Sequence, residues 1–148
     1  MIAILRANWH TDIVDQGIKG FEAEMKVLKF KETDLEIFDV PGALEFPLQA
    51  QLLAKTGKYK AIVCFGFIVD GGIYRHEFVA QAVVDGIVRV SLETEIPVIS
   101  VAISPQKFEE DSQEDLKFFK NHFVEKGKEA AQATVMMIEN IEKLRKKK

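Results

Sequence analysis

The feature that most constrains the fold is an unbroken apolar run from Ala61 to Val69. A strand with one wetted face alternates polar and apolar residues, whereas a run without polar side chains is typical of a strand buried on both faces. Strands of this kind lie in parallel sheets that helices cover on both sides. We therefore expect Ala61–Val69 to form the centre of such a sheet, with the rest of the chain supplying neighbouring strands and covering helices.

Strand-like and helix-like segments alternate along the whole chain. Other strands are predicted at Ile2–Ala7, Leu35–Val40 and Pro97–Ile103, and each strand is followed by apolar residues at helical steps of three and four. The expected inner helix faces are Val14, Ile18, Phe21, Met25 and Leu28; Leu44, Leu48 and Leu52; Val79, Val83, Gly86 and Val90; and Ala130, Thr134, Met137, Ile141 and Leu144. Thr11 or Asp12 is the expected N-cap of the first helix. The alternation predicts a three-layer α/β fold, with a four-stranded parallel sheet and right-handed crossovers.

Size and charge narrow the functional classes. The 148 residues suit one domain spanning residues 1–148, and a formal net charge of -3 does not favour nucleic acid as a partner. No apolar stretch approaches the roughly 20 residues that span a bilayer, and Arg6 and His10 interrupt the first apolar run, so neither a membrane segment nor a signal peptide is predicted. The single cysteine, Cys64, cannot form an internal disulfide, which fits a cytoplasmic protein, and its place in the middle of a strand predicts a core residue. The spacing of the histidines predicts no metal site.

The chemistry is expected at one edge of the sheet. In open parallel α/β sheets, ligands bind beyond the carboxyl ends of the strands, near the point where the strand order reverses. Four segments fall there: Asn8–His10, Val40–Glu45, Phe67–Glu77 and Ser100–Gln106. We expect the binding site to be built from these segments.

Two features of these segments fit ligand binding but also have ordinary structural explanations. Trp9 is the only tryptophan and lies in a polar loop, so its indole could stack on a flat heterocycle or pack over the core or a neighbouring subunit. The Gly71-Gly72 doublet precedes a helix and could offer backbone N–H groups to a phosphate, or simply turn the chain. Both readings stay open for each feature.

Charged residues near the same helix start are further candidates. Arg75 and His76 are the only Arg-His neighbours in the chain. Arginine keeps its charge and offers several donors, whereas histidine exchanges a proton near neutral pH. Cations are disfavoured in a first helical turn, which favours a functional role for this pair. Glu45 either accepts from a ligand hydroxyl or is an ordinary first-turn carboxylate.

Taken together, the motifs resemble the lumazine synthase family over nearly the whole chain. The most specific is Val-Pro-Gly-Ala-Leu-Glu-Phe-Pro at a strand-to-helix junction. The segments that carry the resemblance are Asn8-Trp9, Val40–Pro47, Gly66–Gly72 followed by a cationic helix start, Pro97-Val-Ile, and Lys126-Gly127 opening the last helix. The stretch from Asp70 to Val79, together with Trp9, resembles the type II branch.

The resemblance implies a flavodoxin-like α/β subunit that assembles into pentamers, with the active site at the boundary between two subunits. The type II likeness favours a decamer of two pentamers. The implied enzyme is a transferase of riboflavin biosynthesis. It condenses 5-amino-6-(D-ribitylamino)uracil with 3,4-dihydroxy-2-butanone 4-phosphate, giving 6,7-dimethyl-8-ribityllumazine, phosphate and water, and no cofactor is expected.

The resemblance also assigns substrate contacts. Trp9 would stack on the pyrimidine. The other implied contacts are Ala43, Leu44 and Glu45 along the ribityl chain, Phe67, Ile68 and Val69 around the ring, and Gly72 and Ile73 at the phosphate.

The chain departs from the family pattern at its cationic residues. Arg75 occupies the usual position of the catalytic histidine, with His76 one step later. The usual phosphate-binding arginine falls near Phe118, and His122 and Lys126 are the nearest cations. We therefore expect Arg75 and Lys126 to bind phosphate and stabilise charge, with either histidine carrying the proton. Ser100 replaces a common aromatic residue and would loosen the ring pocket.

Two other functions remain as alternatives. A weakly active or non-catalytic homologue would bind a flavin or a lumazine through the same residues. A receiver-like signalling domain would need an acidic cluster after the first strand and an acceptor aspartate after the third. The first strand instead leads into Asn8-Trp9-His10, which disfavours the signalling alternative.

Overall fold

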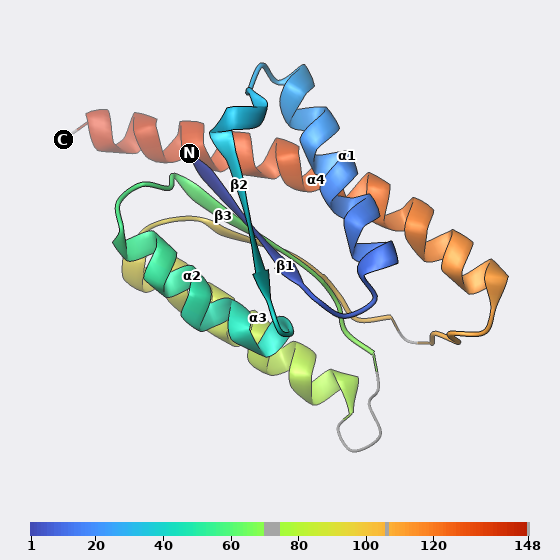
Figure 1. The fold of residues 1–148 in the computed structure, drawn as a ribbon. Coiled ribbons are helices and arrows are strands. Elements are labelled where there is room, and N and C mark those ends of the chain that lie inside the picture. The colour runs from blue at the N-terminus through green and yellow to red at the C-terminus, as the bar shows by residue number, and fades with distance from the viewer. Residues whose placement is uncertain (70–74, 106, 148) are drawn as a thin grey trace.

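The computed structural model describes residues 1–69, 75–105 and 107–147. Strands and helices alternate along these residues (Figure 1). The elements are β1 (Ile2–Ala7), α1 (Thr11–Val27), the 3-10 turn η1 (Glu32–Asp34), β2 (Leu35–Val40), the 3-10 turn η2 (Ala43–Glu45), α2 (Phe46–Lys55), β3 (Ala61–Phe67), α3 (His76–Thr94), β4 (Val98–Ile103) and α4 (Gln113–Lys146).

The four strands form one parallel sheet in the order β2-β1-β3-β4. All seven residues of β3 are buried, which confirms the prediction drawn from the apolar run. Helices α1 and α4 cover one face of the sheet, and α2 and α3 cover the other (Figure 1). The predicted three-layer, flavodoxin-like α/β fold with helices on both faces is therefore confirmed.

Each face of the sheet has its own core. The core beneath α1 and α4 is rich in phenylalanine, with Phe21, Phe65 and Phe123 fully buried. The core beneath α2 and α3 is built around Phe46 and includes Cys64, where burial raises the pKa of the thiol. Because the thiolate is disfavoured there, Cys64 serves as a small apolar core residue, as predicted.

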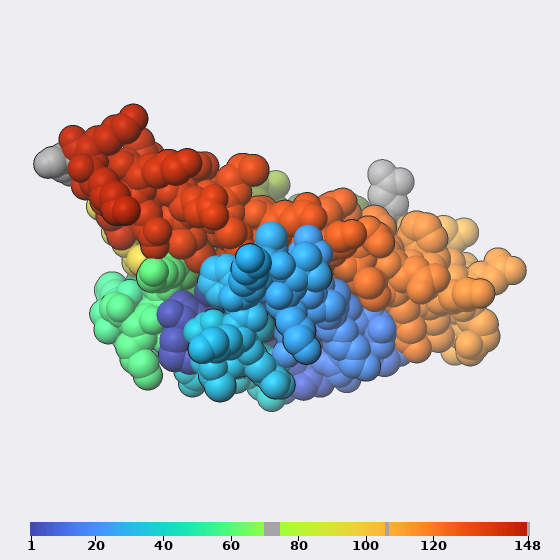
Figure 2. Space-filling view, turned by 90° about the horizontal axis from the view of Figure 1, so that it is seen from above, coloured from blue at the N-terminus to red at the C-terminus, as the bar shows by residue number. Residues whose placement is uncertain are grey.

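Helices α1 and α4 cross unusually closely, and glycines make this approach feasible. A Cβ atom at Gly127 would collide with the carbonyl oxygen of Gly17, and one at Gly20 would collide with the carbonyl oxygen of Val124. A Cβ at Gly17 would lie 2.8 Å from Cδ1 of Phe123. The long α4 lies along α1, and its C-terminal end projects past the rest of the molecule (Figure 2).

Two predicted helix starts are wrong. The N-cap of α1 is His10, in the left-handed backbone region, instead of Thr11 or Asp12. Helix α4 begins at Gln113, so Lys126 lies well inside it and does not open it. The start of α4 follows from local chemistry, because the Ser112 hydroxyl accepts a hydrogen bond from the backbone N–H of Asp115 at 3.1 Å.

The expected inner faces of two helices are also partly wrong. Leu44, Leu48 and Leu52 are 57%, 64% and 55% exposed, and α2 instead buries Phe46, Ala50, Leu53 and Ala54. In α4, Ala130 and Thr134 are buried as predicted, but Met137 and Leu144 are exposed. Apolar residues occur on both faces of these helices, so their spacing alone did not identify the buried face. The inner faces of α1 and α3 agree with the prediction at Ile18, Phe21, Val83 and Val90.

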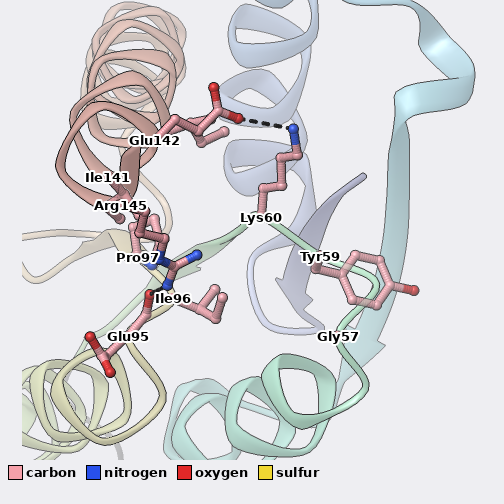
Figure 3. Close-up of a pocket in the computed structure, with 10 residues that line it drawn as sticks. Gly57, Tyr59, Lys60, Glu95, Ile96, Pro97, Ile141, Glu142 and Arg145 are labelled. Carbon is pink, nitrogen blue, oxygen red and sulfur yellow. Dashed lines mark hydrogen bonds and ion pairs between the residues drawn. The ribbon is translucent and has the colours of Figure 1, made fainter. Parts of the chain in front are cut away.

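The amino-terminal edge of the sheet contains a small cavity of about 170 Å³ (Figure 3). Its charged residues contact one another: Arg145 donates to the carbonyl oxygen of Glu95 at 3.2 Å, and Nζ of Lys60 lies 3.0 Å from Oε1 of Glu142. None of the predicted site residues lines this cavity. Among the described residues, no helix is both long and apolar enough to cross a membrane.

Candidate active site

The strand order reverses between β1 and β3, and this places the predicted segments at one edge. After β1 the chain crosses to β2 on one side and then returns past β1 to β3 on the other. The backbone N–H of Asn8 donates to the carbonyl oxygen of Val40 at 3.0 Å, which joins the Trp9 loop to the end of β2. The backbone N–H of Ile68 donates to the carbonyl oxygen of Ile103 at 2.8 Å, which joins the ends of β3 and β4.

Trp9 projects from this edge and is 59% exposed. Its ring meets the imidazole of His10 edge to face, with centroids 5.8 Å apart. Packing over its own core is therefore not the role of the indole in a single chain. An exposed aromatic face at a topological switch point is suited to stacking on a flat ring.

The Val40–Pro47 motif forms the end of β2, a 3-10 turn and the start of α2. The turn comprises Ala43, Leu44 and Glu45, and it lies against α3. Leu44 and Glu45 are exposed, whereas Ala43 is half-buried. Behind the turn, Phe46 is buried and packs close to Gly66 of β3. The motif thus anchors the turn through Phe46 while presenting a carboxylate and an apolar side chain outward.

The residues at the end of β3 are mostly buried in the core below the binding edge. The Phe67 side chain is 2% exposed, and its ring contacts the rings of His10, Phe108, Phe119 and Phe123 at centroid distances of 4.9–5.7 Å. Ile68 is buried on the other face of the sheet and Val69 is half-buried. In a single chain the Phe67 ring is therefore part of the core below the site.

Arg75 and His76 lie at the start of α3, as predicted. Arg75 is the exposed N-cap residue, and the His76 side chain is 13% exposed, with Nε2 3.8 Å from Oε1 of Glu77. Gly72 and Ile73, the predicted phosphate contacts, lie outside the described residues.

The other predicted cations lie on α4, across the sheet from α3. Nζ of Lys126 lies 3.1 Å from Oε2 of Glu129, and the His122 ring stacks on Phe118 with centroids 5.7 Å apart. Ser100 is exposed on the edge strand β4, three residues before its end, and its hydroxyl accepts from the backbone N–H of Ala102 at 3.2 Å. Because α3 and α4 cover opposite faces of the sheet, Lys126 and His122 lie on the other face from Arg75 and His76, whereas Ser100 pairs with Cys64 and so faces the α3 side.

Sequence reasoning missed several residues that hold the edge together. Nε of Arg6 lies 2.9 Å from Oδ1 of Asp15, and Nη1 lies 3.6 Å from Oδ1 of Asp39, so β1, α1 and β2 are linked just below the Trp9 loop. Nε2 of His10 lies 3.3 Å from Oε1 of Glu110. The position of Arg6 within an otherwise apolar strand was a usable signal, whereas nothing in the sequence pairs His10 with a residue 100 positions away.

The fold and the site define a class: a flavodoxin-like α/β protein that offers an exposed aromatic ring at its topological switch point and an exposed carboxylate in the turn after β2. Comparison with known proteins narrows this class. The family model for 6,7-dimethyl-8-ribityllumazine synthase matches residues 1–142. The chain belongs to the 6,7-dimethyl-8-ribityllumazine synthase family.

Individual relatives cover nearly the whole chain. This chain is 50% identical to 6,7-dimethyl-8-ribityllumazine synthase 2 of Pseudomonas syringae pv. tomato, over 98% of this chain and 85% of the relative. It is 48% identical to 6,7-dimethyl-8-ribityllumazine synthase of Rhodococcus erythropolis, over 97% of this chain and 92% of the relative. It is 45% identical to 6,7-dimethyl-8-ribityllumazine synthase 2 of Bradyrhizobium diazoefficiens, over 97% of this chain and 86% of the relative.

Proposed function

We propose that this protein is a transferase that forms 6,7-dimethyl-8-ribityllumazine from 5-amino-6-(D-ribitylamino)uracil and 3,4-dihydroxy-2-butanone 4-phosphate. The observation that carries the proposal is the joining of the exposed Trp9 loop to the end of β2, next to the Val40–Pro47 motif, in a chain of this family. The numeral 2 in the names of two relatives agrees with the resemblance to the type II branch.

The proposed substrate contacts follow the geometry of the edge. Trp9 stacks on the pyrimidine, and the exposed Glu45 accepts hydrogen bonds from ribityl hydroxyls, beside Ala43 and Leu44. Ile68 and Val69 border the ring at the end of β3. Gly72 and Ile73 remain the proposed phosphate contacts.

The proposed chemistry requires orientation and proton transfer. The pyrimidine amine adds to the ketone and water leaves, which gives an imine. Loss of the proton from the hydroxyl-bearing carbon then expels the phosphate, and the resulting enol tautomerises to a second carbonyl. Attack by the ribityl-bearing nitrogen on this carbonyl closes the ring with loss of a second water. Each step is addition, elimination or proton transfer, which positioned polar groups accelerate. In this proposal Arg75 and Lys126 stabilise the leaving phosphate, and His76 or His122 carries the proton.

We also propose that the active site is shared within a homo-oligomer, a decamer of two pentamers. Two observations support sharing. The proposed phosphate residues are divided between α3 and α4 on opposite faces of one sheet, so α4 of another copy would have to approach the α3 edge. Leu44 of η2 and Leu48 and Leu52 of α2 are exposed, as are Val84, Val88 and Leu92 of α3. Exposed apolar side chains on two neighbouring helices are typical of a subunit interface. A cytoplasmic location stays a prediction.

The activity itself is tested by incubating the purified protein with both substrates and following the absorbance and fluorescence of the lumazine product. Product formation that depends on both substrates supports the proposal. Tight binding of riboflavin or the lumazine without product formation would instead favour the non-catalytic homologue.

Replacing Trp9 with alanine is expected to weaken pyrimidine binding by about 1–3 kcal/mol, because the stacking surface is lost while the exposed position contributes little to the core. Since Trp9 is the only tryptophan, quenching of its fluorescence by riboflavin or the lumazine reports stacking directly in the unmodified protein. Calorimetric titration gives the affinity of the variant. Unchanged affinity together with lost assembly would show that the indole belongs to a subunit contact instead.

The double variant Leu48→Lys/Leu52→Lys is expected to yield folded monomers whose activity is at least about tenfold lower, because charges on the proposed interface oppose its burial. Both leucines are exposed in the single chain, so its own core is untouched. Sedimentation velocity, circular dichroism and the product assay check the result. Val27→Lys, at a position 71% exposed at the end of α1, is the matched control. A fully active monomer would refute the shared site.

A further inference from the structure

The pair His10 and Glu110 links two segments that are far apart in the sequence. His10 follows Trp9 directly, whereas Glu110 lies in the segment 107–112 that precedes α4. Nε2 of His10 is shielded from solvent and lies 3.3 Å from Oε1 of Glu110, without a hydrogen-bond partner among the described residues. At this distance the imidazole and the carboxylate of the largely exposed Glu110 side chain are in direct polar contact.

The His10 ring is held from three sides by other aromatic rings. Its neighbours are Trp9, Phe67 and Phe108, at centroid distances of 5.8, 5.7 and 5.4 Å, and each contact is edge to face. Phe67 and Phe108 are also in contact with each other at 4.9 Å. His10 therefore connects the exposed indole to an aromatic cluster that includes Phe108 of the segment 107–112.

The backbone of His10 is held in an unfavourable conformation at the same place. Its φ and ψ angles are 53° and 50°, in the left-handed region that few residues other than glycine adopt, although asparagine, aspartate and histidine do so more often than the rest. The His10 carbonyl oxygen accepts from the backbone N–H groups of Ile13 and Val14, so this conformation starts α1. Strained backbone of this kind persists only where surrounding contacts over-determine it, and it clusters at functional sites.

An ion pair also joins the same two regions. Nζ of Lys120 in α4 lies 3.7 Å from Oδ2 of Asp12 in the first turn of α1. The approach of the start of α4 to the Trp9 loop therefore does not depend on His10 alone, and removing one side chain should leave the fold intact.

We propose that His10 is a positioning residue that fixes the Trp9 indole for stacking on the pyrimidine by clamping the Trp9 loop to the segment 107–112. The clamp consists of the contact between Nε2 of His10 and the Glu110 carboxylate and of the edge-to-face contacts of the imidazole. This proposal rests on the proposed function, because it explains how Trp9 is oriented for the substrate of that reaction. Because Trp9 is exposed, its orientation would otherwise be free to vary, and each binding event would have to restrict it.

The experiment uses Glu110→Ala and His10→Asn in the full-length protein. Glu110→Ala removes the partner of the imidazole from an exposed position, and Glu109→Ala is the matched control one residue away. His10→Asn removes the ring but keeps a residue that tolerates the left-handed backbone. Two readouts are taken: time-resolved fluorescence anisotropy of Trp9 without substrate, and the steady-state constants for 5-amino-6-(D-ribitylamino)uracil.

Both clamp variants are expected to increase the amplitude of fast indole motion, whereas Glu109→Ala leaves it unchanged. The KM for the pyrimidine should rise about threefold in Glu110→Ala, which loses one polar contact, and about tenfold in His10→Asn, which also loses aromatic contacts. The kcat should change less than twofold in both variants. The double variant should resemble His10→Asn alone, because the two side chains act through one contact.

Indole motion that is unchanged in both variants would overturn the clamp, whatever the activity. A fall in kcat at constant KM would also overturn it, because His10 would then act in the chemical step. Increased indole motion in a protein that forms no lumazine product would support the clamp while refuting the proposed function, so the two failures are distinguishable.

Discussion

Replacing the proton-carrying histidine with alanine is expected to lower kcat by a factor of order 10²–10⁴ and to flatten the pH profile near neutrality. The candidates are His76, at the first residue of α3, and His122, on α4. Imine formation and phosphate loss both need a group that gains and releases a proton near neutral pH. Arginine at the neighbouring position 75 does not supply such a group.

The comparison variant Arg75→Ala should behave differently. Loss of a fixed positive charge at the phosphate is expected chiefly to raise the KM for 3,4-dihydroxy-2-butanone 4-phosphate, with the pH profile retained. For His76→Ala, His122→Ala and Arg75→Ala, initial rates of lumazine formation are measured from pH 5 to pH 9. Full kcat and an unchanged pH profile in both His76→Ala and His122→Ala would show that histidine acid/base catalysis is wrong and that positioning and fixed charge suffice.

Replacing Gly127 with alanine is expected to destabilise the fold by at least about 3 kcal/mol. The added Cβ would collide with the backbone carbonyl of Gly17, and a backbone atom has less room to move than the end of a flexible side chain. In an exposed helix, replacing glycine with alanine instead stabilises the protein by about 1 kcal/mol. The expected loss of stability at Gly127 is therefore opposite in sign to the effect of helix propensity. The loss corresponds to a fall in Tm of roughly 6–12 °C for a domain of this size.

The measurement is thermal and denaturant unfolding followed by circular dichroism, at one protein concentration because assembly shifts the apparent Tm. Ala133→Gly, at an exposed position six residues later in α4, is the inverse control and should cost only about 1 kcal/mol. A Gly127→Ala protein as stable as the unmodified one would mean that α1 and α4 do not cross as closely as the structure shows.

The sequence by itself determined the elements whose signal is local. The run from Ala61 to Val69 identified the central strand, and Ile2–Ala7 was predicted with the bounds that the structure has. The motif from Val40 to Pro47 identified the junction between β2 and α2. These predictions held because strand burial and turn chemistry depend on neighbouring residues, and parallel strands necessarily place their carboxyl ends at one edge.

Other features were decided only by the tertiary structure. Helix α2 has apolar residues on two faces, and packing against β3 selected Phe46 for the core and left Leu48 exposed. The sheet separates His76 from Lys126, although both matched one expected phosphate site. The contact between His10 and Glu110 joins residues 100 positions apart. Helical periodicity states which residues share a face, but which face is buried, and which distant segment covers it, depends on long-range packing that no local pattern records.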